Sequence, residues 1–262
     1  MNAIPTKDFE TVCCHSLGLI DQNREYLQMH LSGKGDKRTE QALSDIEIES
    51  ARIERAVNEM LSLLELSEVK TGSEKESNLC WFDLCRVVQS VEAMQEDISR
   101  QLGVKLTVKT EPVKQAWLRA NVERTEQIIF HLLSNALRAC SPGGKVELRL
   151  EKKGGSYLLT VLDNGCGLPK ENRWQENRRR FLGGARLGLQ LCRAYCEEAG
   201  WSLTLTDRKG RGTQAQLKMS LPSEEPEIPS TVDLHAAGTP EPTRLPRLLE
   251  REVRMLRPIS ES

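Results

Sequence analysis

The sequence has no excess of charge of either sign. Its 262 residues include 37 Lys and Arg and 38 Asp and Glu, which gives a formal net charge of −1 at pH 7. Proteins that bind nucleic acid or an anionic membrane surface through their overall charge carry a basic excess. The balance favours neither partner, and we expect no nucleic acid.

Long apolar runs are also absent. A helix that spans a bilayer needs about 20 apolar residues, whereas runs such as IIFHLL at 128–133 are far shorter. The N-terminal residues MNAIPTKDFE contain no apolar core of the signal-peptide kind. We therefore expect a cytoplasmic chain without membrane insertion, long enough for about two modest domains.

No two cysteines have the C-x-x-C spacing, although the chain contains eight cysteines. They lie at positions 13, 14, 80, 85, 140, 166, 192 and 196. This spacing does not favour a zinc site, and without an export signal we expect no disulfides. We interpret the cysteines as free thiols that serve as small buried apolar residues.

Residues 8–67 are predicted to form a helical hairpin, broken by the turn SGKGD at 32–36. The second helix has apolar residues three and four positions apart, interrupted only by Ser50, which is typical of a coiled-coil seam. These residues are Leu43, Ile46, Ile53, Val57, Met60 and Leu64, and a rougher seam in the first helix contains Phe9, Cys13, Ser16, Ile20 and Leu27. One hairpin cannot cover both seams, so we expect a homodimer with a four-helix bundle. The alternative is a hairpin that packs on its own C-terminal domain.

Residues 79–222 predict a second domain, which mixes strands and helices. The segments GVKLTVKT at 103–110 and KVELRLEKKGGSYLLTVLDNG at 145–165 alternate like strands, and the second predicts a β-hairpin. Helical segments are expected at 83–102, 122–140 and 187–199. The predicted fold class is α+β, with the helical hairpin followed by a two-layer α/β sandwich that has a mixed, largely antiparallel sheet.

Residues 223–262 are rich in proline, serine and glutamate. This composition is typical of a linker or a disordered tail. We expect at most a short basic amphipathic helix there, near RLLEREVRMLR at 247–257.

The stretch VLDNGCGLP, at 161–169, predicts a strand that stops on Asp163 and is followed by Gly165 and Gly167. A carboxylate at a strand end can accept a hydrogen bond from an amino group, and glycine lets a flat ligand approach the backbone closely. The pattern therefore suggests a ligand site. An ordinary Asp-Asn-Gly turn is the alternative.

A polar stripe is predicted on the helix NVERTEQIIFHLLSNALRAC at 121–140. His131, Asn135 and Arg138 lie at positions i, i+4 and i+7 and so share one side of this helix. Their imidazole, carboxamide and guanidinium groups suit a metal ion and phosphates. The alternative is that the stripe is the water-facing side of an ordinary amphipathic helix.

Four blocks, in the order of the chain, resemble the bacterial two-component sensor histidine kinases. They are LSDIEIESARIERAVNEMLSLLELSE at 43–68, HLLSNALRACSPGG at 131–144, VLDNGCGLP at 161–169 and GGARLGLQLCRAYCEEAGWSLTLTDRKGRGTQAQLKMSLP at 183–222. The first is similar to the family's dimerisation and phosphoacceptor hairpin, and the others are similar to its GHKL-type ATP-binding domain. The resemblance covers residues 8–222 and implies ATP and Mg²⁺ as cofactors.

The resemblance also implies roles for individual residues of the ATP site. Asn135 would hold Mg²⁺ between the helix and the phosphates, and Arg138 would bind phosphate where the family often has a lysine. Asp163 would accept a hydrogen bond from the adenine amino group. Gly165 and Gly167 would leave space beside the purine.

The last block contains the family's two other glycine boxes. The box whose backbone N–H groups open a helix onto the phosphates is matched by Leu187, Gly188 and Leu189. The box at the turn before the final strand is matched by Gly210, Gly212 and Thr213. The resemblance places Thr213 near the carboxylate that binds adenine.

His15, in VCCHSLGLI, is implied as the phosphoacceptor, and helical geometry places it off the apolar seam. The family usually follows this histidine with an acidic residue and, a turn later, a proline, where this chain has Ser16 and Ile20. Within the ATP site, His131 replaces the usual asparagine, and Arg186 replaces the first glycine of a G-L-G-L box. These departures make nucleotide binding more strongly implied than catalysis.

The implied function is that of an ATP-dependent protein-histidine kinase. It would transfer the γ-phosphate to His15 and then to an aspartate of a response regulator receiver domain. One alternative is a catalytically degenerate dimeric switch that binds ATP and regulates a partner by contact. Another is a serine kinase similar to the anti-sigma factors, which share the ATP-binding fold, although the long phosphoacceptor-like hairpin argues against it.

Overall fold

The computed structural model describes residues 18, 20, 22–29, 37–68, 79–168, 187–222 and 244–256. The chain divides into two compact units, one with residues 1–72 and 183–191 and the other with residues 73–182 and 192–262. None of the described helices is long and apolar enough to cross a bilayer.

The first unit contains the helix α2 (Lys37–Glu68), of 32 residues. Residues 22–29 are also helical, and the Arg24 guanidinium lies 3.4 Å from the Glu47 carboxylate of α2. Part of the predicted seam is exposed, at Ile46, Ile53, Met60 and Leu64. The predicted turn at 32–36 lies outside the described residues, so the helical hairpin stays a prediction.

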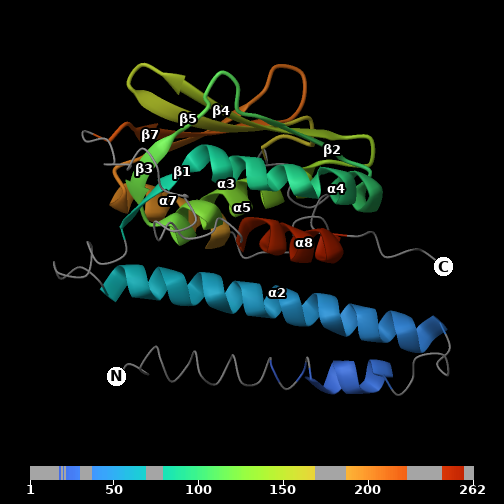
Figure 1. The fold of residues 1–262 in the computed structure, drawn as a ribbon. Helices are drawn as coiled ribbons and strands as arrows, with labels where there is room; N and C mark the ends of the chain where they lie inside the picture. Colours follow the sequence, from blue (N-terminus) through green and yellow to red (C-terminus); the bar gives the residue numbers. More distant parts are fainter. Residues whose placement is uncertain are drawn as a thin grey trace, which may run out of the picture. The chain divides into compact units, whose positions relative to one another are not determined.

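The second unit contains two sheets and a layer of helices (Figure 1). In chain order the elements are β1 (Cys80–Asp83), α3 (Leu84–Ser90), the 3-10 helix η1 (Val91–Met94), α4 (Gln95–Leu102), β2 (Lys105–Lys109), β3 (Trp117–Ala120), α5 (Val122–Ala139), β4 (Lys145–Lys153), β5 (Ser156–Asp163), α7 (Leu187–Glu198), β6 (Ser202–Asp207), β7 (Thr213–Ser220) and α8 (Arg244–Leu256). Residues 187–191 of α7 fall in the first unit.

The larger sheet is mixed, with the strand order β2-β4-β5-β7-β6. β2 runs parallel to β4, and the other neighbouring pairs are antiparallel. β1 and β3 form a separate antiparallel pair. This arrangement confirms the predicted α+β class and the mixed, largely antiparallel sheet.

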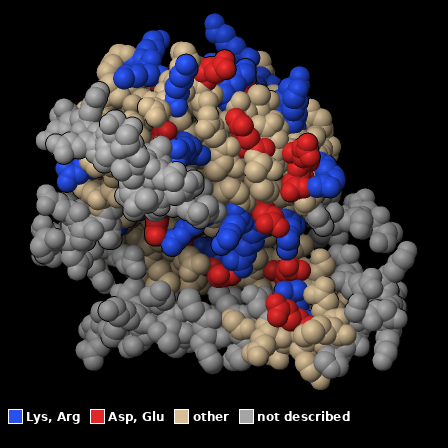
Figure 2. All heavy atoms as spheres, in the orientation of Figure 1, with Lys and Arg blue, Asp and Glu red and all other residues tan. Residues whose placement is uncertain are grey.

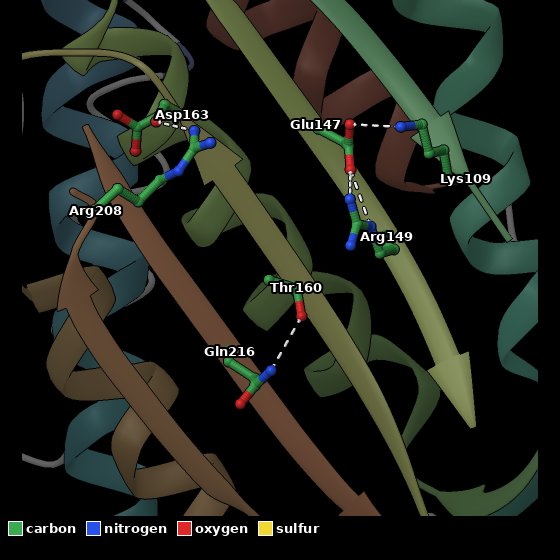
Figure 3. A network of polar contacts seen from close by, with 7 residues as sticks. All are labelled: Lys109, Glu147, Arg149, Thr160, Asp163, Arg208 and Gln216. Carbon is green, nitrogen blue, oxygen red and sulfur yellow. Dashed lines mark hydrogen bonds and ion pairs between the residues drawn. The ribbon is translucent and has the colours of Figure 1, made fainter. Parts of the chain in front are cut away.

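The larger sheet has one apolar and one polar face. In β4, Leu148 and Leu150 are completely buried, whereas Glu147 and Arg149, which alternate with them, are partly exposed. On the polar face, the Lys109 Nζ donates a 2.8 Å hydrogen bond to Glu147, and Arg149 pairs with the same carboxylate (Figure 3). Burial alone would raise the pKa of Glu147, but these hydrogen bonds outweigh it and lower the pKa. The helices α3, α4 and α5 pack against the sheet.

Charges of both signs are mixed on the described surface. Figure 2 shows Lys and Arg interspersed with Asp and Glu on the face that it draws. This distribution agrees with the net charge near zero and shows no large basic region on that face.

Two local signals explain where α5 begins and which side it buries. The Asn121 carboxamide oxygen accepts a 3.0 Å hydrogen bond from the Arg124 N–H, which caps the first turn. The apolar side of the helix is buried at Ile129, Leu132, Leu133 and Ala136. α5 is therefore fixed to the sheet by its apolar side, with its polar stripe turned elsewhere.

The segment 223–262, predicted as a linker with at most a short amphipathic helix, contains the 13-residue helix α8. α8 packs against α5, α4, η1 and α3. Figure 1 shows it in red below these helices, on the side away from the sheet. Its Leu245, Leu249 and Val253 are completely buried. The predicted boundaries of the preceding domains, 8–67 and 79–222, stay predictions.

Candidate functional site

Asp163 is the last residue of β5 and lies on the same side of the strand as the buried Leu159 and Val161. Its Oδ1 accepts hydrogen bonds from the backbone N–H groups of Gly165, at 2.8 Å, and Thr213, at 3.1 Å. Burial raises the pKa of the Asp163 carboxyl, and the two hydrogen bonds limit this rise because they favour the charged form. The carboxylate is therefore held in a defined orientation on the helix-covered face of the sheet.

Two arginines of the β6–β7 turn bind the main chain around Asp163. The Arg208 Nη1 donates a 2.7 Å hydrogen bond to the Asp163 carbonyl oxygen (Figure 3), and the Arg211 Nε donates one of 3.2 Å to the Gly165 carbonyl oxygen. Sequence reasoning did not single out either arginine. The available signal was their position in the glycine box itself, within DRKGRG at 207–212.

The loop after Asp163 is also fixed to β4 and α5. The Asn164 Oδ1 accepts a 2.7 Å hydrogen bond from the Lys145 N–H, and the Asn164 N–H donates one of 3.2 Å to the Lys145 carbonyl oxygen. The Cys166 N–H donates to the Ala139 carbonyl oxygen at 3.1 Å. The start of β4 and the end of α5 are thus joined through this loop.

Gly165 and Gly212 are required by the packing of the protein itself. A Cβ atom on Gly165 would overlap the Ala139 carbonyl group, and one on Gly212 would overlap the Asp163 carbonyl group. Gly212 also has a φ of +100°, which L-residues rarely adopt. These glycines therefore have a structural role that needs no ligand. The space that Gly165 and Gly167 would leave beside a purine stays a prediction.

The polar stripe of α5 is divided among different environments. His131 is only 4% exposed, and its ring centroid lies 5.3 Å from that of Phe130. Asn135 is exposed, whereas the Arg138 side chain is 12% exposed. Helical spacing placed the three residues on one side, but it could not show that another element covers part of the stripe.

The covering element near Arg138 is α8. Glu252 of α8 is completely buried, and its Oε1 accepts hydrogen bonds from the Arg138 Nε at 2.8 Å and the Ser134 Oγ at 2.7 Å. The Arg138 Nη2 lies 2.7 Å from the same oxygen. The family resemblance implies that the Arg138 guanidinium binds phosphate. In the structure, one edge of this guanidinium contacts the Glu252 carboxylate of α8 instead.

The remaining predicted residues are distributed as follows. Residues 187–189 form the first turn of α7, as expected for a box that opens a helix. Gly210 and Gly212 lie in the turn before β7, which begins at Thr213. His15 and Arg186 lie outside the described residues. The structure therefore brings together Asp163 with the residues of the last glycine box.

Comparison with known protein families agrees with this geometry. Residues 120–223 match the family described as histidine kinase-, DNA gyrase B-, and HSP90-like ATPases. The match covers less than half of the chain. The matched segment includes α5, the Asp163 loop, α7 and the last glycine box, and it ends before α8.

Two curated relatives extend the match to sensor proteins. The alginate biosynthesis sensor protein KinB of Pseudomonas aeruginosa is 29% identical over 207 residues, which are 75% of this chain and 33% of KinB. The sensor histidine kinase YkoH of Bacillus subtilis is 26% identical over 77% of this chain and 44% of its own length. These relatives confirm the resemblance to sensor histidine kinases. The chain spans less than half the length of either.

Two solved structures share the fold. Full-length ShkA in complex with AMPPNP has a TM-score of 0.60 and 16% identity, over 84% of this chain and 47% of ShkA. The histidine kinase ThkA in complex with the response regulator protein TrrA has a TM-score of 0.53 and 20% identity, over 82% of this chain and 61% of the matched chain. At these identities the likeness concerns the fold alone.

Proposed function

We propose that the chain is an ATP-dependent protein-histidine kinase of a two-component signalling system that acts in the cytoplasm. It transfers the γ-phosphate of ATP to His15 and then to an aspartate on the receiver domain of a response regulator. The observation that carries this proposal is the buried Asp163 carboxylate, held by two backbone N–H groups inside the segment that matches the ATPase family.

Asp163 is suited to select adenine. Both backbone hydrogen bonds end on Oδ1. The Thr213 hydroxyl also hydrogen-bonds the carboxylate, but a carboxylate has about four acceptor sites, so it can still accept a hydrogen bond from the adenine amino group. Guanine has a carbonyl oxygen at the corresponding ring position, so two acceptors would face each other. Because the carboxylate is already oriented, binding needs little reorganisation.

Mg²⁺ fits this arrangement through Asn135. Among the described residues, no group of three or more His, Cys, Asp or Glu could hold a metal ion. The ion would take most of its ligands from phosphates and water, which is usual for Mg²⁺, and the exposed Asn135 carboxamide can add one oxygen. When bound, Mg²⁺ would neutralise charge on the phosphates. The Arg138 fork would contact the same phosphates.

Phosphoryl transfer to His15 requires correct positioning more than covalent help from the chain. Ser16 stands where the resembling kinases have an acidic residue. That acid would accept the proton of the attacking imidazole, and such assistance accounts for about 10²- to 10⁴-fold in rate. We therefore expect slow autophosphorylation.

A homodimer would cover the exposed apolar side of α2. Ile46, Ile53, Met60 and Leu64 are exposed by 43, 52, 37 and 41%, and they lie seven, seven and four positions apart, as the residues of a helix seam do. A second copy of the hairpin supplies an identical seam, so that two copies complete a four-helix bundle. Dimerisation would also supply the surface on which a receiver domain docks, and the complex of ThkA with TrrA supports a partner of that class.

The second candidate is the nucleotide-binding switch. The ion pair between Arg138 and Glu252 favours it, because one edge of a phosphate-binding group is engaged elsewhere. The replacements at Ser16 and Ile20 point the same way. In this case the protein binds ATP and changes its contacts with a partner without phosphorylating itself.

Incubation of the full chain with γ-labelled ATP and Mg²⁺ tests the proposal. We expect label that is lost in acid and survives in base, because phosphohistidine is acid-labile. His15→Gln should abolish labelling and retain ATP binding, with His30→Gln as the matched control. Acid-stable label would indicate a serine kinase. ATP binding without any label after hours would favour the switch.

A further inference from the structure

The helix α8 carries a buried acidic residue on a side that is otherwise apolar. Leu245, Leu249 and Val253 face the other helices of the unit, and Glu252 lies among them without any exposed surface. Replacing a buried ion pair with apolar residues is often neutral or stabilising. Apolar packing therefore does not explain why a glutamate is buried at position 252. The explanation must come from the groups that hydrogen-bond to it.

The partners of Glu252 form a set of donors that recognises anions. The Nε and Nη2 of Arg138 and the hydroxyl of Ser134 all converge on the Glu252 Oε1, at 2.7 to 2.8 Å. A guanidinium edge and a hydroxyl bind phosphate oxygens as readily as carboxylate oxygens. Both donors lie on α5, one turn apart, and Asn135 lies between them in sequence.

We propose that α8 is a built-in competitor of the nucleotide. The Glu252 carboxylate occupies, on Arg138 and Ser134, the position that a phosphate oxygen of ATP takes. This inference rests on the proposed binding of ATP and concerns the regulation of that same site. When phosphate displaces Glu252, the carboxylate loses the donors that make its burial tolerable, and α8 leaves its place on α5.

The other contacts of α8 are compatible with release. The Arg244 guanidinium pairs with Glu123 at 2.8 Å, but both side chains are more than half exposed, and such pairs add little stability. Glu126 of α5 accepts a hydrogen bond from the Leu245 N–H of α8, but its Oε1 is buried without a hydrogen-bond partner, which penalises the docked state. Docking thus depends mainly on the buried apolar side chains of α8, on the Leu245 N–H bond to Glu126 and on the Glu252 cluster.

The coupling must be reciprocal. The factor by which docked α8 weakens ATP binding equals the factor by which bound ATP weakens docking. Two independent measurements therefore report the same quantity, one at the nucleotide and one at the helix.

The test is calorimetry on the full chain with a non-hydrolysable ATP analogue and Mg²⁺. Glu252→Gln removes the competing charge with little change in shape, and we expect it to tighten binding by roughly tenfold, as for the loss of one hydrogen bond between charged groups. Glu250→Gln is the matched control, because Glu250 is exposed and pairs along the helix with Arg254. It should leave the affinity unchanged. In an Arg138→Met background the gain from Glu252→Gln should disappear.

Hydrogen exchange measured on the parent chain provides the second readout. Backbone amides of residues 244–256 should exchange faster when the analogue is bound. Leu249→Glu should detach α8 by placing a charge at a buried apolar position. Like Glu252→Gln, it should tighten binding of the analogue. A second variant keeps the test valid if one of the two folds poorly.

The two levels of the proposal fail in different ways. If the parent binds the analogue while Glu252→Gln and Leu249→Glu bind it equally well or more weakly, and α8 exchange does not respond, α8 is no competitor although the ATP site stands. If neither the parent nor these variants bind the analogue, the proposed ATP-binding function is wrong and the competition falls with it.

Discussion

The backbone N–H of Thr213 donates a 3.1 Å hydrogen bond to the carboxylate of Asp163, 50 positions earlier in the sequence. The bond links the start of β7 to the end of β5, which are neighbouring antiparallel strands. The main chain thus sets the orientation of the carboxylate. The Asp163 side chain can therefore be changed chemically while the Oδ1 that accepts this hydrogen bond is kept.

Asp163→Asn makes that alteration. The Oδ1 can still accept from Thr213 and Gly165, but the second oxygen becomes an amide donor, which faces the adenine amino group unfavourably. We expect ATP affinity to fall by about ten- to hundredfold, with a smaller loss for GTP. Calorimetry with both nucleotides measures this, with Asp207→Asn as the control. Equal losses for ATP and GTP would place the adenine elsewhere.

Asn135→Ala tests the metal position. Removing the carboxamide removes one Mg²⁺ ligand, so ATP should bind with nearly the same weak affinity with and without Mg²⁺. The loss relative to the parent with Mg²⁺ should be roughly tenfold or more. The comparable change Gln89→Ala removes an exposed carboxamide of α3 and should have no effect. Full Mg²⁺ dependence in the Asn135 variant would contradict this assignment.

Ile53→Asp tests the dimer. Ile53 is 52% exposed in the single chain, so the substitution should disturb the isolated unit little. In a four-helix bundle it would bury an unpaired charge and should yield monomers at micromolar concentration. Light scattering distinguishes the two states, and Ile53→Leu should remain dimeric. A parent protein that is already monomeric would show that the bundle does not form.

The pKa of Glu126 predicts a pH dependence of stability. Burial raises this pKa from its ordinary value of 4.5 to about 7, and the charge of Glu123 adds to the rise while Arg244 and the Leu245 N–H oppose it. The folded state favours the protonated form of Glu126. The contribution of this protonation to the stability of the folded state is therefore complete below about pH 4.5 and is lost as pH rises to about 7.

Glu126→Gln should remove this dependence. At pH 8 the variant should be more stable than the parent by about 1–3 kcal/mol, and at pH 5 the difference should be much smaller. Denaturant unfolding at the two pH values measures it. Glu96→Gln, which changes an exposed carboxyl of α4 that does not contribute to the Glu126 shift, is the control. The same difference at both pH values would mean that the carboxyl does not titrate in this range.

Local patterns in the sequence predicted the elements well. The alternation in β4 and β5 identified both strands and the hairpin between them, because a half-buried strand must change face at each residue. The end of β5 at Asp163 followed from the same pattern. The spacing of His131, Asn135 and Arg138 correctly placed them on one helix, since 3.6 residues complete a turn.

The partners across elements could not be predicted in this way. Periodicity indicates which side of a helix is polar, but not whether water, phosphate or a carboxylate faces it. Arg138 and Glu252 are 114 positions apart, and the segment that contains Glu252 has the composition of a linker. The role of Gly165 was hidden for a related reason, because its close approach to Ala139 depends on where α5 ends.

The order of the strands along the chain also determines when the hydrogen bond between Thr213 and Asp163 can form during synthesis on the ribosome. β4 and β5 are joined by a tight turn and pair with each other locally, so this hairpin can assemble as soon as residue 163 has emerged. Thr213 follows 50 residues later. During that interval Asp163 lacks its hydrogen-bond partner on β7, and the carboxylate becomes fixed only when most of the segment 120–223 has been synthesised.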